Sequence, residues 1–206
     1  DRSEWHMPAH LVNAYYDPQQ NQIVFPAAIL QAPFYSLSQS SSANYGGIGA
    51  VIAHEISHAF DTNGASFDEF GSLKNWWTDE DFAAFKVRTD RVVAQFDGLD
   101  SYGAKVNGKL TVSENVADLG GLAAALAAAA QDPDFSATDF FESWATIWRM
   151  KARPEYMQLL AASDPHGPAK LRVNVQVKNF DAFFAAFNVQ PSDGMWLAPA
   201  ERVQIW

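Results

Sequence analysis

Two histidines and a glutamate in the first third of the chain have the spacing of a zinc site. They lie in AVIAHEISHAFD, from Ala50 to Asp61, which contains the pattern H-E-x-x-H. On a helix His54 and His58 share one face because they are four residues apart, and Glu55 lies beside them. Two neutral imidazoles can supply two ligands of a tetrahedral zinc, and the glutamate can act as a general base. The pattern therefore predicts metal-assisted hydrolysis of peptides.

Chance is the first alternative to this interpretation. In a chain with 5 His among 206 residues, an accidental H-E-x-x-H arises roughly once in two hundred such sequences. Apolar neighbours predict a buried amphipathic helix, in which two histidines without a ligand would be costly to desolvate. These neighbours are Ile48, Val51, Ile52, Ile56, Ala59 and Phe60. A metal site is therefore preferred to purely structural histidines.

A catalytic zinc normally has three protein ligands, so one more is needed. The metzincin pattern would require a glycine and a histidine at Asp61 and Gly64, and it is therefore excluded. Glu114 is the best candidate, because it begins a helix rich in alanine and glycine that could pack closely against the histidine helix. Asp118, one turn later, could accept a hydrogen bond from a ligating imidazole. Taken alone, such an acidic pair would usually be a solvated helix start.

Composition indicates a globular protein and argues against several partners. The chain is 48% hydrophobic and 14% aromatic over 206 residues, which is enough for a proper core. Its net charge of −10 argues against nucleic acid and anionic membranes as partners. Cysteine is absent, so any metal must be bound by His, Asp or Glu. No segment approaches the ~18 apolar residues of a membrane span.

The elements expected around these residues form one mainly helical domain of the α+β class, spanning 1–206. A β-hairpin is expected over 11–25, in LVNAYY and QIVF, and LRVNVQV at 171–177 is expected to be extended. Loops are expected at 63–77 and 98–108. One helix is expected to begin at NYGGIG and to include the H-E-x-x-H motif. A second is expected after the capping residue Thr78, and a third after the capping residue Ser113 to about Gln131. Three more are expected at 138–151, 154–162 and 179–187.

Two separated blocks, HEISHAFD and ENVADLGG, together resemble the neprilysin family of zinc endopeptidases, whose signature pairs H-E-x-x-H-x-F-D with E-N-x-A-D-x-G-G. NAYYDPQQNQIVFPAAILQAPF, NYGGIGAVIAHE and FDEFGSLKNWW are also similar to blocks of that family, so the resemblance covers essentially the whole chain. It implies a thermolysin-like (gluzincin) catalytic domain with one Zn²⁺ held by His54, His58 and Glu114. It also implies Glu55 as the base and Asp118 as the carboxylate that orients a ligand.

The resemblance makes Asp61 a weaker second candidate for orienting a metal ligand. It also implies roles for residues outside the metal site. In the family the Asn and Ala of N-A-Y-Y bind the substrate backbone, which implies that role for Asn13 and Ala14. By pattern alone LVNAYY would be an ordinary aromatic strand. A histidine and an arginine six residues apart stabilise the oxyanion and hold a substrate carbonyl in the family, which implies those roles for His166 and Arg172. By pattern alone His166 is a solvated residue of the DPHGP turn.

The implied activity is cleavage of oligopeptides on the amino side of hydrophobic residues. Family members are longer, and an upstream, largely helical region encloses their cleft, so the chain is expected to be part of a longer protein with that region as a partner. Animal members outside the cell carry disulfides, so a bacterial and cytoplasmic source is expected. The alternative from another class is a non-catalytic peptide-binding module or a zinc-stabilised module.

Overall fold

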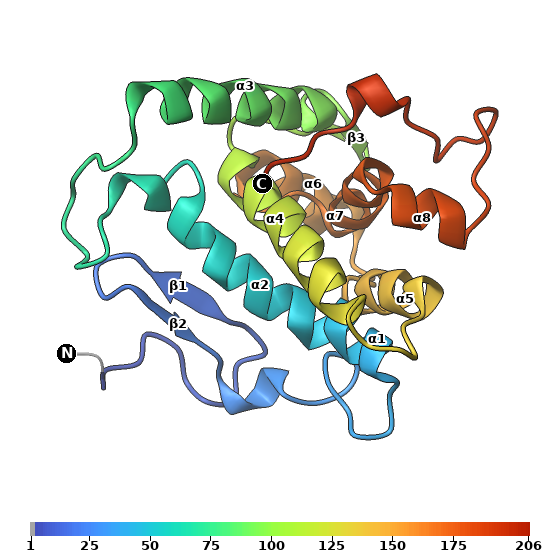
Figure 1. Ribbon diagram of the computed structural model, residues 1–206, viewed down its shortest axis with the longest axis horizontal. Helices are drawn as coiled ribbons and strands as arrows, with labels where there is room; N and C mark the ends of the chain where they lie inside the picture. Colours follow the sequence, from blue (N-terminus) through green and yellow to red (C-terminus); the bar gives the residue numbers. More distant parts are fainter. Residues whose placement is uncertain (1–2) are drawn as a thin grey trace.

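The computed structural model describes residues 3–206, and its centre is a pair of helices, α2 and α4, packed side by side (Figure 1). The β1–β2 hairpin lies on one side of this pair, α3 crosses one end, and α5 to α8 cover the other side. The elements are β1 (Tyr15–Asp17), β2 (Gln22–Val24), α1 (Ser41–Asn44), α2 (Ala50–Ser57), α3 (Asp79–Phe96), β3 (Asp100–Ser101), β4 (Ala104–Lys105), α4 (Val112–Ala129), α5 (Ala137–Ile147), α6 (Pro154–Ser163), α7 (Ala169–Asn174) and α8 (Asp181–Ala186).

The H-E-x-x-H motif lies on a continuous helical run from Ser41 to Phe60. The run begins as α1, passes through a π-helical segment at Tyr45–Gly49, continues as α2 and ends in a 3₁₀ turn at His58–Phe60. NYGGIG is therefore inside the helical run, which begins earlier than the sequence predicted. The reason is a cap at Ser40, whose hydroxyl accepts a hydrogen bond from the Ala43 amide at 3.2 Å.

Glycine brings α4 into backbone contact with α2. A Cβ at Gly121 would lie 2.6 Å from the amide nitrogen of His54 and 2.8 Å from its Cα. Only a residue without a side chain allows this approach. The expectation that the small residues of α4 pack closely against the histidine helix is confirmed, and the approach brings Glu114 and Asp118 opposite the histidines.

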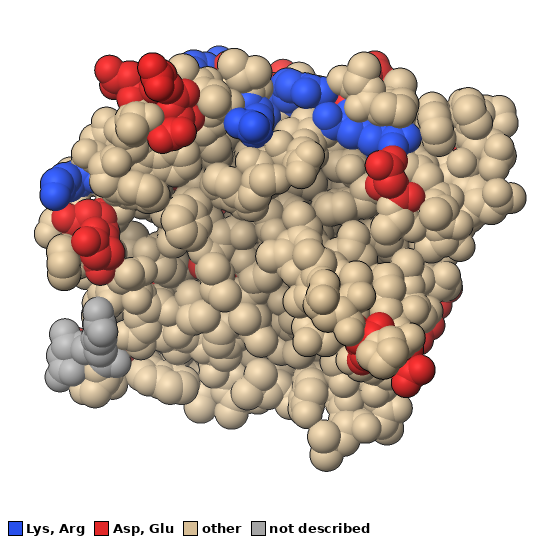
Figure 2. All heavy atoms as spheres, in the orientation of Figure 1, with Lys and Arg blue, Asp and Glu red and all other residues tan. Residues whose placement is uncertain are grey.

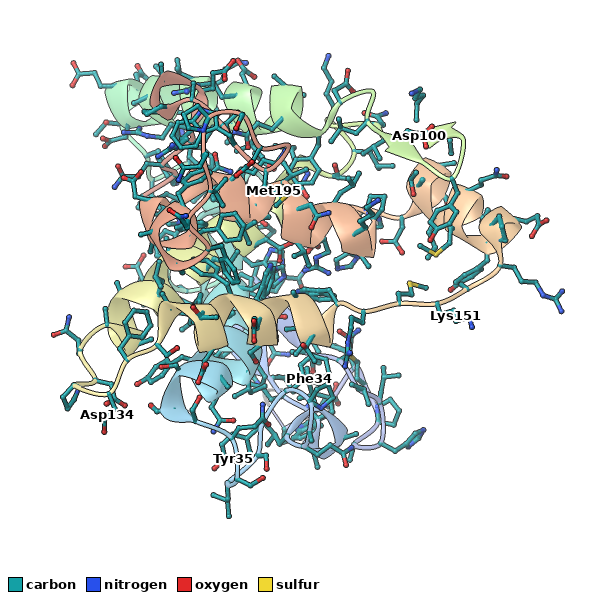
Figure 3. All side chains as sticks on the ribbon, turned by 90° about the vertical axis from the view of Figure 1, so that its right-hand side faces the viewer. Phe34, Tyr35, Asp100, Asp134, Lys151 and Met195 are labelled. Carbon is teal, nitrogen blue, oxygen red and sulfur yellow. The ribbon has the colours of Figure 1, made fainter. Side chains whose placement is uncertain are left out.

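The core is divided between the two sides of α4. Figure 3 shows α5 between the segment that carries Phe34 and the segment that carries Met195. The buried Phe140, Phe141 and Trp144 of α5 belong to the larger apolar cluster, together with residues of α2 and α8. The smaller cluster lies between α3, the start of α4 and the C-terminal segment.

Several expected elements are confirmed. β1 and β2 form an antiparallel hairpin in which Tyr15 is paired with Val24, although its strands are shorter than predicted. Thr78 caps α3, because its hydroxyl accepts a hydrogen bond from the Asp81 amide at 3.1 Å. The predicted helices over 138–151, 154–162 and 179–187 correspond to α5, α6 and α8. The mainly helical α+β class is confirmed as well.

The prediction of an extended segment at 171–177 was wrong, because this segment is α7 followed by a 3₁₀ turn at Gln176–Asn179. Its alternating valines resemble a strand, but the buried polar residues Arg172 and Gln176 are four apart, as a helical run requires. Arg172 binds Asp118, and the Gln176 amide donates to the Asn115 carbonyl at 2.8 Å. These tertiary partners override the local pattern.

Two further expectations need correction near α4. The loop predicted at 98–108 contains the β3–β4 hairpin, whose turn has positive φ at Tyr102 (53°) and Gly103 (89°). A tyrosine there is not a usual turn signal, so the hairpin was missed. Ser113 does not cap α4, which begins at Val112 with Thr111 as the capping residue and no side-chain cap. The Ser113 hydroxyl is bonded elsewhere.

The histidine helix is not buried at every apolar position. Ile52, Ile56 and Phe60 are 37%, 50% and 39% exposed, on the face opposite His54. No element within residues 3–206 covers these side chains fully. In Figure 2 the charged side chains of the face drawn in Figure 1 gather towards its edges, and the middle of that face is largely uncharged.

We expect Gly121→Ala to lower the free energy of unfolding by about 1–3 kcal/mol, because the new methyl group must displace the backbone of His54. Alanine is about 1 kcal/mol better than glycine in a helix, so propensity alone predicts the opposite sign. Urea unfolding measures the change. The matched control is Gly194→Ala, where a Cβ has no neighbour within 4 Å. Equal stabilities of the two variants would contradict the close contact.

Candidate active site

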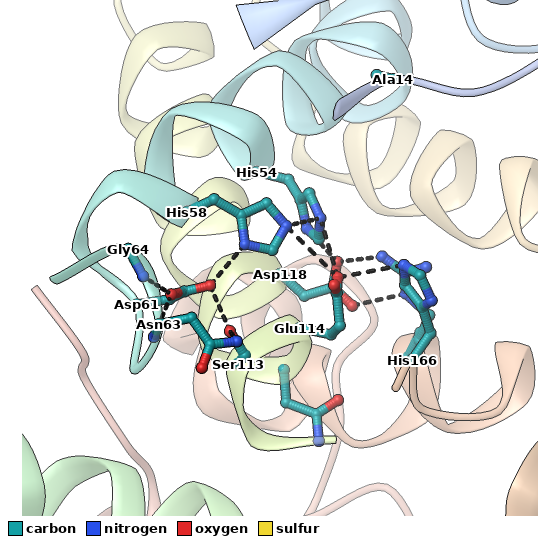
Figure 4. A network of polar contacts seen from close by, with 12 residues as sticks. Ala14, His54, His58, Asp61, Asn63, Gly64, Ser113, Glu114, Asp118 and His166 are labelled. Atoms are coloured by element: carbon teal, nitrogen blue, oxygen red, sulfur yellow. Dashed lines mark hydrogen bonds and ion pairs between the residues drawn. The ribbon is translucent and has the colours of Figure 1, made fainter. Parts of the chain in front are cut away.

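Three side chains from two helices meet at one point, as Figure 4 shows. The Nε2 atoms of His54 and His58 lie 3.0 Å apart. Glu114 Oε2 lies 3.3 Å from the His54 Nε2 and 3.5 Å from the His58 Nε2. A tetrahedral ion with ligand bonds of about 2.0–2.1 Å holds its ligand atoms about 3.3 Å apart. The spacing of these three atoms therefore fits a tetrahedral metal ion.

Hydrogen bonds fix which nitrogen of each imidazole faces the meeting point. His54 Nδ1 lies 2.8 Å from Asp118 Oδ1, and His58 Nδ1 lies 2.6 Å from Asp61 Oδ2. A carboxylate can only accept, so each Nδ1 carries the proton and donates it. In the neutral rings both Nε2 atoms then present lone pairs to each other. Such an arrangement requires a cation between them, either a proton or a metal ion.

Glu114 adds a second sign of a cation site. Its Oε2 is buried, and three imidazole nitrogens, the Nε2 atoms of His54, His58 and His166, lie 3.2–3.5 Å from it. Burial alone would raise the pKa of this carboxyl, but His54, His58 and His166 lower it well below its ordinary value. For His58 burial acts in the opposite direction and lowers the pKa, because it disfavours the charged ring. Asp61 and Glu114 outweigh burial and raise this pKa to about 10. The site thus strongly favours positive charge at its centre.

Asp118 is held from two sides. It accepts hydrogen bonds from His54 and from the guanidinium of Arg172, whose Nε and Nη2 lie 2.7 Å and 2.6 Å from its two oxygens. Both residues are buried, so each compensates the other's lost hydration. Burial raises the pKa of Asp118, but Arg172 and His54 outweigh it and keep the carboxyl ionised. The Arg172 guanidinium also stacks on the Trp148 ring, 3.7 Å from its centroid.

Asp61 holds the second imidazole in the same way. It is 1% exposed, at the end of the helical run. Its Oδ1 accepts hydrogen bonds from the amides of Asn63 and Gly64, each at 2.7 Å. Its Oδ2 accepts from His58 and from the Ser113 hydroxyl, the latter at 2.5 Å. The site therefore contains one orienting carboxylate for each histidine.

Glu55 is buried at 5% exposure and lines the same cavity as the histidines. Burial raises the pKa of this carboxyl above its ordinary value, and the neighbouring His54 and His58 offset only part of that effect. A carboxylate whose pKa is raised towards neutrality is a better proton acceptor and donor. Glu55 thus has the environment of a general base.

His166 approaches the site from the loop before α7. Its Nε2 lies 3.2 Å from Glu114 Oε2, and its Nδ1 lies 2.8 Å from Asp164 Oδ1. Its side chain is 44% exposed, so it borders the open side of the site. The DPHGP pattern alone indicated a solvated loop residue, whereas the fold brings this ring next to Glu114.

A cavity of about 400 Å³ joins these groups to the β1 segment. Asn13 and Ala14 line it at the start of the hairpin, and Figure 4 shows Ala14 on the far side of the histidines from Ser113. The Asn13 side-chain oxygen accepts a hydrogen bond from the Ala14 amide at 2.9 Å. All ten site residues predicted from the sequence line this one cavity: Asn13, Ala14, His54, Glu55, His58, Asp61, Glu114, Asp118, His166 and Arg172.

Three further residues of the site were not predicted. Asp164 orients His166, Ser113 binds Asp61, and Trp148 supports Arg172. An aspartate two residues before a histidine is a local signal that could have been used for Asp164. The other two contacts join segments that are far apart in the sequence, so no local pattern indicates them.

The chain matches known proteins in sequence and in structure. The model of peptidase family M13 matches residues 13–203. The neutral endopeptidase of Lactococcus lactis subsp. lactis (strain IL1403) is 57% identical over 206 residues, which are 100% of this chain and 33% of that protein. The chain thus spans about a third of the length of this relative.

Two solved structures have the same fold. The crystal structure of PepO from Lactobacillus rhamnosis HN001 matches with a TM-score of 0.96 at 54% identity, over 100% of this chain and 33% of that one. The Mycobacterium tuberculosis zinc metalloprotease Zmp1, in complex with an inhibitor, matches with a TM-score of 0.92 at 44% identity, over 100% and 34%.

We expect Glu114→Gln to weaken metal binding by more than about a hundredfold, because the amide removes the negative charge that a ligand must supply. Isothermal titration with Zn²⁺ measures the affinity, and circular dichroism checks the fold. The control is Glu142→Gln, an exposed glutamate of α5. Equal affinity of the Glu114 variant and the control would exclude Glu114 as a ligand.

Proposed function

The chain belongs to peptidase family M13, the neprilysin family, and from this membership we propose that it is the catalytic part of a zinc endopeptidase that hydrolyses oligopeptides. The observation that carries the proposal is the meeting of two imidazole lone pairs and one buried carboxylate oxygen at tetrahedral spacing. A non-catalytic module would not need a general base beside that point. Glu55 occupies that position.

The proposed metal is one Zn²⁺ per chain, held by His54, His58 and Glu114. Two imidazoles and a carboxylate suit zinc, and a set of three leaves the further position that catalysis requires. When bound there, Zn²⁺ would polarise the scissile carbonyl and lower the pKa of the attacking water. The orienting carboxylates Asp61 and Asp118 support the proposal, because such partners fix the ring orientation of ligating histidines.

Glu55 is proposed to move the proton. Its carboxylate accepts a proton from the attacking water and then donates it to the nitrogen of the leaving amine. Its raised pKa supports both steps, because the group can hold the proton between them. When both of its ring nitrogens carry protons, His166 is proposed to donate a hydrogen bond from Nε2 to the developing oxyanion, because Asp164 holds Nδ1. Its position at the open side of the site, next to Glu114, supports this role.

The substrate backbone is proposed to run along the β1 segment. Asn13 and Ala14 precede the paired residues of β1, so their backbone carbonyls can accept hydrogen bonds from an extended peptide. Arg172 is proposed to bind a substrate carbonyl. Its Nη1 is not used in either hydrogen bond to Asp118, and its side chain lines the cavity.

The cavity also supports a preference for peptides cut on the amino side of a hydrophobic residue. Its lining includes four apolar side chains of one cluster, Ile29, Phe34, Val51 and Trp148, and Trp148 stacks against Arg172. We propose that they receive the side chain that follows the scissile bond. Burying a leucine or phenylalanine side chain there contributes about 1.5–3 kcal/mol to binding.

The proposed partner of this chain is the remaining part of a longer parent protein. The chain corresponds to 33% of the Lactococcus lactis relative. The exposed face of the histidine helix, with Ile52, Ile56 and Phe60, supports this partner, because a largely apolar helix face normally packs against another element. No helix within residues 3–206 is long and apolar enough to cross a membrane.

We expect Glu55→Gln to reduce turnover of a quenched fluorescent peptide by about 10²–10⁴-fold while one zinc per chain is retained, because glutamine cannot accept the proton. Atomic absorption measures the zinc, and Glu142→Gln is the control. Activity within a few-fold of the unchanged protein would refute Glu55 as the base. Absence of any chelator-sensitive hydrolysis by the unchanged intact protein would instead favour the peptide-binding or zinc-stabilised module.

We expect Val51→Phe to shift substrate preference, because the larger ring fills part of the apolar wall of the cavity. The ratio of kcat/KM for a peptide with leucine after the scissile bond to one with alanine should fall about tenfold or more. The control is Val87→Phe, the same substitution at an exposed position of α3. An unchanged ratio in the Val51 variant would show that the pocket lies elsewhere.

A further inference from the structure

The Ser113 side chain has a role that its position at the start of a helix does not predict. Ser113 is the second residue of α4 and immediately precedes Glu114. A serine near a helix start normally caps the backbone amides, but α4 has no side-chain cap. The hydroxyl instead points towards the loop after the histidine helix and lines the same cavity as the proposed metal ligands.

Two hydrogen bonds hold this hydroxyl in place. It donates to Asp61 Oδ2 at 2.5 Å and accepts from the Asn63 side-chain amide at 3.1 Å. The order of donors therefore runs from Asn63 to Ser113 to Asp61, and His58 donates to the same Asp61 oxygen. Figure 4 shows this row of contacts between α4 and the end of the helical run.

The buried Asp61 depends on all four of its donors. Two are the amides of Asn63 and Gly64, and the other two are His58 and Ser113. A buried carboxylate that loses one donor leaves a lone pair without a partner, which costs more than an ordinary hydrogen bond contributes. Without the hydroxyl, Asp61 would have to rotate or admit water, and either change would alter the acceptor that orients His58.

The two histidines also differ in how their carboxylates are linked to Glu114. Asp118 lies on α4 itself, one turn after Glu114, so the helix backbone fixes both. Asp61 lies on a separate segment after the helical run. Ser113 provides the hydrogen-bonded link from Asp61 to α4, next to Glu114 in the chain. This hydroxyl therefore supplies for His58 the connection that the helix supplies for His54.

We propose that Ser113 is a positioning residue of the metal site, which fixes Asp61, and through it the His58 ring, relative to Glu114. The inference rests on the proposed metal site. Residues that orient a ligand typically contribute a factor of 10–100 to metal affinity. The hydroxyl is hydrogen-bonded to Asp61 and Asn63 and to none of the proposed ligands, so its effect should appear first in metal binding and in coordination geometry.

The test uses Ser113→Ala and Ser113→Thr in the intact protein. Alanine should weaken Zn²⁺ binding by about 10–100-fold, and threonine, which keeps the hydroxyl, should remain close to the unchanged protein. The visible absorption spectrum of the Co²⁺-loaded protein should change with alanine and not with threonine. The control is Ser143→Ala, because the buried Ser143 hydroxyl has no hydrogen-bond partner among the described residues.

The possible outcomes separate this inference from the proposed function. If the unchanged protein binds one zinc, and Ser113→Ala has the same affinity and the same Co²⁺ spectrum, Ser113 has no positioning role. If the unchanged protein binds no metal, the proposed function itself fails. Should Ser113→Ala not fold, Asn63→Ala removes the donor to the hydroxyl, and a several-fold weaker affinity is expected. Unchanged affinity in that variant overturns the inference.

Discussion

The structure depends on one electrostatic constraint. The buried imidazole of His54 and the partly buried imidazole of His58 turn their lone pairs towards each other and towards the partly buried carboxylate of Glu114. Asp61 and Asp118 hold the protonated nitrogens of His58 and His54, so neither ring can rotate to relieve the contact without losing a hydrogen bond. A positive charge at the meeting point satisfies all three groups. The rest of the fold keeps these side chains in position: glycine brings α4 against α2, and α5 and α7 close one side of the cavity.

The parts of the site that are local in sequence could be predicted from it. His54, Glu55 and His58 follow from the four-residue helical spacing, and the small residues of α4 indicated a helix that could approach them. Within α4, one turn separates Glu114 from Asp118, so the position of one on that face implies the other. These relations depend on helix geometry alone, which the pattern of residue types reveals.

The remaining features depend on tertiary contacts that a single sequence does not show. The valines of 171–177 suggested a strand, but the bidentate contact of Arg172 with Asp118 requires a helix there. Ser113 has the residue type of a cap, yet a carboxylate 52 positions away in the chain takes its hydroxyl. Ile56 was expected to be buried because it is apolar. Whether an apolar face is covered depends on what packs against it, and residues 3–206 leave it half exposed.

The mechanism requires His54, His58 and Glu114 to bind one metal ion together. Diffraction from crystals of the zinc-loaded protein, recorded on both sides of the zinc absorption edge, tests it most directly. We expect one anomalous peak per chain, about 2.0–2.2 Å from both Nε2 atoms and from a Glu114 carboxylate oxygen. A zinc-loaded crystal with its peak elsewhere, or with Glu114 out of bonding distance, would contradict it.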